Sequence, residues 1–166
     1  LPKHRGASPI QQTLLDGDTE TGATLFFVDE KIDHGNIIST IKYQVSNKDT
    51  YLTLEEKLAR MSAESLMSLL QNFNKEKIFA KNQDHSKATL TNKFITEDGL
   101  VDLSKDDPEI IVRKIRALNP EPGVYTIQNG KRFKLLEVKM VDDKWIITKT
   151  QLEGKNPKND KIVLNS

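Results

Sequence analysis

Hydrophobic and polar positions recur along the chain with two periods, one typical of helices and one typical of strands. Over residues 53–72 the apolar residues return near every 3.6 positions, and Thr53 and Glu56 have the spacing of a capping box. Over residues 37–45 apolar and polar residues alternate, as in a strand with one buried face. We therefore expect helices at 9–16, 53–72 and 108–118, and strands at 23–28, 37–45, 124–127, 132–140, 145–151 and 161–164.

Capping and turn residues support these bounds. Ser8 and Asp107 suit N-cap positions, and a proline follows each of them at the first helical position. The pair Asn129-Gly130 is a strong signal for a tight hairpin, so the last strands are expected to form a small barrel or a meander. Between 74 and 94 the chain is polar and rich in lysine, which is typical of a connection that runs over the surface.

One long apolar stripe is expected on the helix at 53–72, because its leucines and methionine fall on one side. Its members are Leu54, Leu58, Met61, Leu66, Leu69, Leu70 and Phe73.

Charge and composition exclude several classes of function. The 166 residues include 25 basic and 24 acidic side chains, so a net charge of +1 makes no general case for nucleic acid or membrane. Residues 120–166 hold 9 basic and 6 acidic side chains, a net of +3, which leaves 16 and 18 for the rest. This asymmetry permits a polyanionic partner near the C-terminal end. The absence of cysteine excludes disulfides and thiolate chemistry, and fits a reducing, cytoplasmic environment.

Candidate chemistry gathers in the acidic loop after the apolar run 23–28. Ligands of open α/β sheets collect outside the carboxyl ends of strands, and Asp33 lies in that position. The alternative is that Asp33 is a turn residue before Gly35. The three histidines are dispersed, and no set of His, Asp and Glu has the spacing of metal ligands, so no metal is expected.

Several ordered motifs show a family resemblance that covers most of the chain. They are LPKHRGASPIQ, GDTETGATLFFVDEKIDHGN, DGLVDLSKDDPEIIVRKIRALNPEPGVYT, NGKRFKLLEV and QLEGKNP. The chain resembles the formyltransferases that use 10-formyltetrahydrofolate, and within them the members that act on methionyl-tRNA. The chain has no initiator Met and opens inside a motif, so we expect a piece of a longer protein.

The resemblance implies an α/β fold with three parts. Residues 1–74 would be the C-terminal part of a Rossmann-like formyltransferase domain, and residues 75–97 a linker. Residues 98–166 would form a small OB-like β-barrel that binds tRNA.

The resemblance also implies site residues. Asp33 would be catalytic, as a base or as the residue that orients one, and the folate co-substrate would contact Leu1, Pro2, Glu30 and Ile32. In the family an Asn and a His upstream of the first motif complete the site, so this chain alone is expected to be inactive. Positions that depart from the family pattern are Lys31, His34, Asn36 and Glu121.

The implied activity is transfer of a formyl group from 10-formyltetrahydrofolate to the amino group of methionyl initiator tRNA, in translation initiation, by a monomer. Two alternatives stay open: a formyltransferase that acts on an amino-sugar nucleotide, and a non-catalytic RNA-binding module. Side chains expected at the nucleic acid are Arg5, Arg113, Lys114, Lys131, Arg132 and Lys134. For each of these cations the ordinary alternative is a solvated surface position.

Overall fold

The computed structural model describes residues 1–72 and 78–164, which fall into two compact units. The first unit comprises residues 1–13 and 18–93, and the second comprises residues 14–17 and 94–166. None of the described helices has the length and apolar content that crossing a membrane requires.

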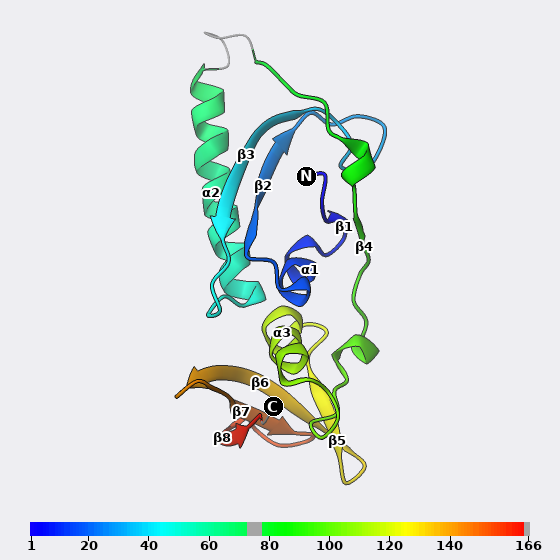
Figure 1. The fold of residues 1–166 in the computed structure, drawn as a ribbon, viewed down its shortest axis with the longest axis vertical. Coiled ribbons are helices and arrows are strands. Elements are labelled where there is room, and N and C mark those ends of the chain that lie inside the picture. Colours follow the sequence, from blue (N-terminus) through cyan, green and yellow to red (C-terminus); the bar gives the residue numbers. More distant parts are fainter. Residues whose placement is uncertain (73–77, 165–166) are drawn as a thin grey trace. The chain divides into compact units, whose positions relative to one another are not determined.

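A pair of antiparallel strands is the centre of the first unit. Strands β2 (Glu20–Phe26) and β3 (Ile37–Gln44) pair from Glu20↔Gln44 to Phe26↔Ile37, with an irregularity at Leu25/Phe26. The long helix α2 (Tyr51–Asn72) lies along one face of this pair (Figure 1). The helical period over 53–72 and the strand alternation over 37–45 are therefore confirmed. The strand expected at 23–28 instead begins at Glu20 and ends at Phe26, and Phe27 and Val28 are exposed.

Four shorter elements accompany the strand pair and α2. Strand β1 (Arg5–Gly6) pairs in parallel with β4 (Leu90–Thr91), and a short 3-10 helix, η1 (His85–Lys87), precedes β4. Helix α1 (Pro9–Asp16) follows β1 and starts at Pro9 as expected; its residues up to Thr13 belong to this unit, and those from Leu14 belong to the second. Thus residues 81–91, which were expected to run over the surface as a connection, make backbone and side-chain contacts inside the first unit.

Helix α2 begins two residues earlier than expected because its cap is Thr50 rather than Thr53. The Thr53 N–H donates to Thr50 Oγ1 (3.4 Å), and the Thr50 N–H donates to Thr53 Oγ1 (2.9 Å). This arrangement satisfies donors that the first turn of a helix leaves free.

The expected apolar stripe of α2 is buried over its first half only. Leu54 and Leu58 are buried, whereas Leu66 and Leu70 are 43% and 53% exposed. A helix of 22 residues is about 33 Å long, and the facing strand β3 of 8 residues is about 26 Å long, so the last turns extend past it. Phe73, the last residue of the stripe, lies outside the described residues.

The second unit is a helix packed on a four-stranded sheet. After a 3-10 turn, η2 (Thr96–Gly99), the chain enters helix α3 (Pro108–Leu118), which packs against β6. The Asp107 side chain accepts a hydrogen bond from the Glu109 N–H (2.7 Å), which confirms the expected cap. The core consists of Val101, Ile111, Val112, Ile115, Ala117, Leu118, Val124, Tyr125, Phe133, Leu135, Ile146, Ile147 and Leu164.

The sheet of the second unit is a four-stranded meander, one of the two arrangements that the strand spacing predicted, and the OB-like barrel that the resemblance implies is not confirmed. Its order is β5 (Tyr125–Gln128), β6 (Lys131–Val141), β7 (Lys144–Leu152) and β8 (Lys158–Val163). Tight turns at Asn129-Gly130 and Asp142-Asp143, all with positive φ, join neighbouring strands. Within residues 94–164, no pairing of β5 with β8 closes the sheet.

Candidate active site

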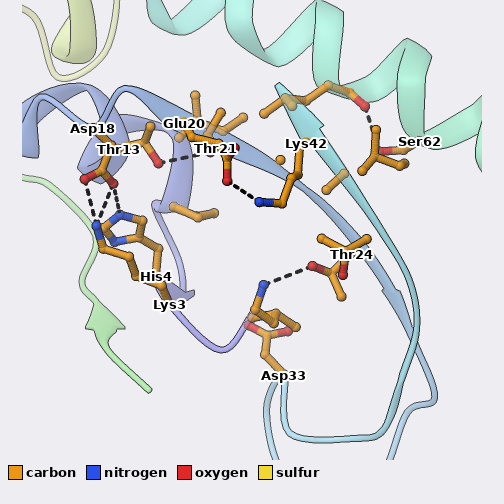
Figure 2. A pocket seen from close by; sticks show the side chains of 18 of the residues that line it. Lys3, His4, Thr13, Asp18, Glu20, Thr21, Thr24, Asp33, Lys42 and Ser62 are labelled. Atoms are coloured by element: carbon orange, nitrogen blue, oxygen red, sulfur yellow. Dashed lines mark hydrogen bonds and ion pairs between the residues drawn. The ribbon is translucent and has the colours of Figure 1, made fainter. Parts of the chain in front are cut away.

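A pocket of about 630 Å³ opens in the first unit beside strands β2 and β3 (Figure 2). Pro9 and Ile10 of α1, Ile41 of β3 and Leu58 of α2 contribute apolar walls. Polar groups, including Asp33, come to the same space from separate segments of the chain. This volume lies in the range of about 300–1,000 Å³ that is typical of small-molecule pockets.

Asp33 reaches the pocket from the loop between β2 and β3. It is half-buried, and its Oδ2 accepts a hydrogen bond from the Gly6 N–H (3.0 Å). Its backbone has a φ of 51°, in the left-handed region that Asp adopts more easily than most residues. The carboxylate is therefore held by a backbone donor from a second segment.

Gly35 sets the tight course of this loop. A Cβ added at Gly35 would lie 1.7 Å from the Phe27 carbonyl oxygen, so no larger residue fits without a backbone shift. The loop is closed beside it by a hydrogen bond from the Phe27 N–H to the Asn36 carbonyl (2.9 Å).

Asp18 contacts a lysine and a histidine in another part of the pocket lining. Its carboxylate accepts hydrogen bonds from Lys3 Nζ (2.7 and 2.8 Å) and lies 2.7 Å from His4 Nε2, as Figure 2 shows. Burial by itself raises the pKa of Asp18, but the hydrogen bonds from Lys3 and His4 outweigh it and hold that pKa below its ordinary value. This carboxylate is therefore ionised at neutral pH.

A buried polar network lies behind the Asp33 loop. Arg5 and Gln83 are only 8% and 5% exposed, and Arg5 Nη2 donates to Gln83 Oε1 (2.8 Å). Gln83 Nε2 donates to the carbonyls of Asp33 (3.0 Å) and Gly35 (2.7 Å). The network joins the first motif, the acidic loop and the segment after α2.

Two stacked histidines extend this network toward the surface. The rings of His34 and His85 lie 3.9 Å apart and within 2° of parallel. Arg5 Nη2 donates to His85 Nδ1 (2.9 Å), and His34 Nδ1 lies 2.7 Å from Asp29 Oδ2. Desolvation lowers the pKa of His85, and the neighbouring His34 and Arg5 lower it further, so the neutral ring is favoured.

The structure brings together some of the expected site residues and not others. Leu1 and Asp33 line one pocket, and the Leu1 nitrogen donates to Thr24 Oγ1 (2.9 Å). Pro2 is half-buried but does not line the pocket; Glu30 is exposed and Ile32 is 79% exposed. The folate contacts expected of Leu1, Pro2, Glu30 and Ile32 and the catalytic role expected of Asp33 stay predictions.

The sequence reasoning missed Gln83. It lies in a polar stretch that was interpreted as a surface connection, and no local pattern distinguishes it from its neighbours. Its partners lie 48, 50 and 78 residues away along the chain, so only the fold reveals them.

The side chains expected to contact nucleic acid differ in their exposure to solvent. Arg5 is buried in the network described above. On α3, Arg113 Nη1 donates to the Asp16 carbonyl (3.2 Å), and Lys114 Nζ donates to the Leu100 carbonyl (3.0 Å). The hairpin cations, by which we mean Lys131, Arg132 and Lys134, are all exposed on β6. They are the most accessible of the set.

Sequence comparison places the chain in a family. The family model for formyl transferase matches residues 1–70, and the model for the formyl transferase C-terminal domain matches residues 93–148. The chain belongs to the formyl transferase family. A methionyl-tRNA formyltransferase from Kosmotoga olearia is 38% identical over 143 residues, which cover 86% of this chain and 46% of that relative. This formyl transferase chain thus spans about half the length of the curated relatives it matches.

Solved structures show the same fold at lower identity. The methionyl-tRNA formyltransferase from Clostridium thermocellum has a TM-score of 0.70 at 20% identity, covering all of this chain and 66% of that one. An N-formyltransferase from Helicobacter canadensis, solved with folinic acid and dTDP-3-aminofucose, has a TM-score of 0.63 at 20% identity, covering 98% and 63%. The formyl transferase fold is therefore shared with a protein named for methionyl-tRNA and with one solved with an amino-sugar nucleotide bound.

Proposed function

We propose that the protein containing this chain transfers a formyl group from 10-formyltetrahydrofolate to the amino group of methionyl initiator tRNA, as a cytoplasmic monomer in translation initiation. The single observation that carries this proposal is the pocket that Leu1 and Asp33 share. They come from two separate motifs of the family resemblance, and both lie within the part of the chain that the formyl transferase model matches.

Formyl transfer requires few chemical groups from the protein. The amino nitrogen attacks the formyl carbon, the formyl oxygen gains negative charge, and the bond from that carbon to the folate nitrogen then breaks. The attacking amine loses one proton and the folate nitrogen gains one. Asp33 is the group proposed to accept the proton from the amine, directly or by orienting a second base.

The pocket suits a co-substrate with an aromatic head and polar edges. Phe26 and Ile41 contribute apolar walls, while Thr24 and Asp33 lie among the polar groups along the same space. Leu1, Pro2, Glu30 and Ile32 are the proposed folate contacts, and of these Leu1 lines the pocket.

For tRNA we propose the second unit, in the role that the family gives to an OB-like domain over residues 98–166. The hairpin cations are exposed, and phosphate contacts by Lys and Arg supply most non-specific nucleic-acid affinity. Arg113 and Lys114 are proposed as further contacts, whereas Arg5 is only 8% exposed and donates to Gln83 and His85, so the nucleic-acid contact expected of it is not proposed. Residues 1–74 are proposed to carry the chemistry, with residues 75–97 as the sequence that links the two parts.

A transfer assay tests the proposal. Labelled 10-formyltetrahydrofolate and methionyl initiator tRNA are given to this chain alone and to the chain joined to the part of the Kosmotoga olearia relative that it does not match. We expect turnover by the joined protein, and a loss of about 10²–10⁴-fold on Asp33→Asn if the carboxylate handles the proton. Asp29→Asn, in the same loop but outside the pocket lining, is the control and should retain the rate.

The same assay separates the alternatives. Formylation of an amino-sugar nucleotide in preference to methionyl-tRNA would replace the proposed substrate. Salt-dependent tRNA binding without any folate binding would identify an RNA-binding module instead. Full activity of the Asp33→Asn protein would remove Asp33 from the chemistry.

A further inference from the structure

We propose that Gln83, acting with Arg5, is a positioning residue that holds Asp33 in the conformation needed for proton transfer. The catalytic meaning of this role rests on the proposed function, but the geometry stands without it. Gln83 comes from the segment after α2, while Asp33 comes from the loop between β2 and β3.

A glutamine fits this position better than any other side chain of its size. Its amide has one acceptor oxygen, which faces the Arg5 guanidinium, and an NH₂ group, which faces the carbonyls of Asp33 and Gly35. An arginine can only donate and a carbonyl can only accept, so the opposite amide orientation would break all three bonds. Glutamate has no hydrogen to give to the carbonyls, and methionine gives and accepts none of these bonds.

Arg5 and the residue that follows it, Gly6, also restrain Asp33. Its own backbone is fixed because the Arg5 N–H donates to the Thr89 carbonyl (2.9 Å) and Thr91 Oγ1 donates to the Arg5 carbonyl (3.2 Å). The next residue, Gly6, donates its N–H to the Asp33 carboxylate. Gly6 lies against β4 so closely that a Cβ there would be 2.5 Å from the Thr91 carbonyl oxygen.

The backbone of Asp33 is therefore fixed by Gln83, and its carboxylate is fixed by Gly6. A non-glycine residue keeps a left-handed conformation only where its surroundings over-determine it. Here the donors on both sides depend on one segment, residues 83–91, which supplies Gln83 and the β4 residues that hold Arg5 and Gly6. Loss of the Gln83 amide should release the loop and weaken the bond from the Gly6 N–H to Asp33.

Nuclear magnetic resonance of this chain tests the inference without any assumption about activity. We expect Gln83→Met to move the Gly6 amide proton upfield and to speed its hydrogen exchange by about tenfold or more, the change for a broken hydrogen bond worth about 1.4 kcal/mol. Gln44→Met is the matched control, because Gln44 donates to Glu20 on the exposed side of the strand pair. It should change neither observable. If Gln83 only stabilised the fold, Gln83→Met would lower the melting temperature and leave the Gly6 amide signal unchanged.

Two further measurements keep the test decisive if Gln83→Met does not fold. Gln83→Glu retains an acceptor for Arg5 but loses both donors, so it should shift the Gly6 signal in the same direction. In the unaltered chain, the side-chain NH₂ protons of Gln83 should exchange at least tenfold more slowly than those of Gln44. Exchange at equal rates, or a Gly6 signal unchanged in a folded variant, would overturn the proposal.

In the joined protein, Gln83→Met should reduce kcat and leave the KM for both substrates nearly unchanged, because it displaces a reacting group and not a binding surface. If the joined protein shows no transfer at all, the proposed function fails while the resonance experiment still decides the role of Gln83. An unchanged kcat together with a displaced Gly6 signal would show that Asp33 is positioned by Gln83 but does not act in the reaction.

Discussion

Replacing Gly35 by alanine should displace the Asp33 loop, because a Cβ at this position has no space. The added atom would lie 1.7 Å from the Phe27 carbonyl oxygen, whereas real Cβ atoms stay beyond 3.0 Å, so the two backbones must separate by about 1.3 Å. Neither backbone segment can move without breaking a hydrogen bond, since the Gly35 carbonyl accepts from Gln83 and the Phe27 N–H donates to the Asn36 carbonyl.

The size of the effect follows from this displacement. Overpacking against a fixed neighbour costs about 1–3 kcal/mol of unfolding free energy. A misplacement of about 1 Å in a catalytic group costs on the order of 10²-fold in rate. We therefore expect Gly35→Ala to lower the stability of the first unit by about 1–3 kcal/mol. In the joined protein it should lower kcat by roughly two orders of magnitude.

Urea unfolding followed by two probes measures the stability change. Backbone amide signals of β2 and β3 report the first unit. Trp145, the one tryptophan of the sequence, belongs to the second unit, where its Nε1 donates to Glu109 Oε1 (3.0 Å), so its fluorescence should show an unchanged transition. Asn36→Ala removes a neighbouring exposed side chain and keeps the backbone, and it should behave like the parent chain. Native stability and native Asp33 signals in Gly35→Ala would refute the argument from close approach.

Three further outcomes are expected. Desolvation, His34 and Arg5 lower the pKa of His85 from 6.5, so the unfolded chain takes up a proton before the folded one does. The first unit should therefore lose stability as pH falls from 8 to 5. Urea unfolding midpoints should show this loss, and the loss should be smaller in His85→Gln. Ile147→Ala, at a fully buried core position, should cost the second unit about 2–5 kcal/mol in Trp145-monitored unfolding. Changing the hairpin cations to glutamine should weaken tRNA binding and flatten its dependence on log salt by about 0.7–0.9 for each phosphate that the protein no longer neutralises; an unchanged slope would place the tRNA elsewhere.

Local signals were enough to predict the elements whose causes are local. Helix α3 begins at Pro108 because Asp107 caps it, and both residues are visible as a pair in the sequence. The β5–β6 hairpin follows from Asn129-Gly130, two residues that accept positive φ. In each case the residues that decide the structure are neighbours along the chain.

Other features depend on what each side chain meets in space. Periodicity predicts which side of α2 is apolar, but the exposure of Leu66 and Leu70 depends on how far the facing strands reach. The four C-terminal strands were predictable, whereas the open edge of their sheet depends on pairing between the first and last strands. The family pattern pointed to Asp33, but it could not show which groups hold that carboxylate.

Gln83 shows why a boundary drawn along the sequence can differ from one drawn through contacts. The family resemblance makes residues 75–97 a linker, because they lie between two matched segments. The described residues 78–93 nevertheless belong to the first unit: Lys81 exchanges backbone hydrogen bonds with Ile37, and Thr91 fixes Arg5. These bonds reach both sides of Asp33, through the carbonyl that Gln83 holds and through Gly6. A chain segment that connects two domains can therefore also determine the geometry of a site to which it contributes no reacting atom.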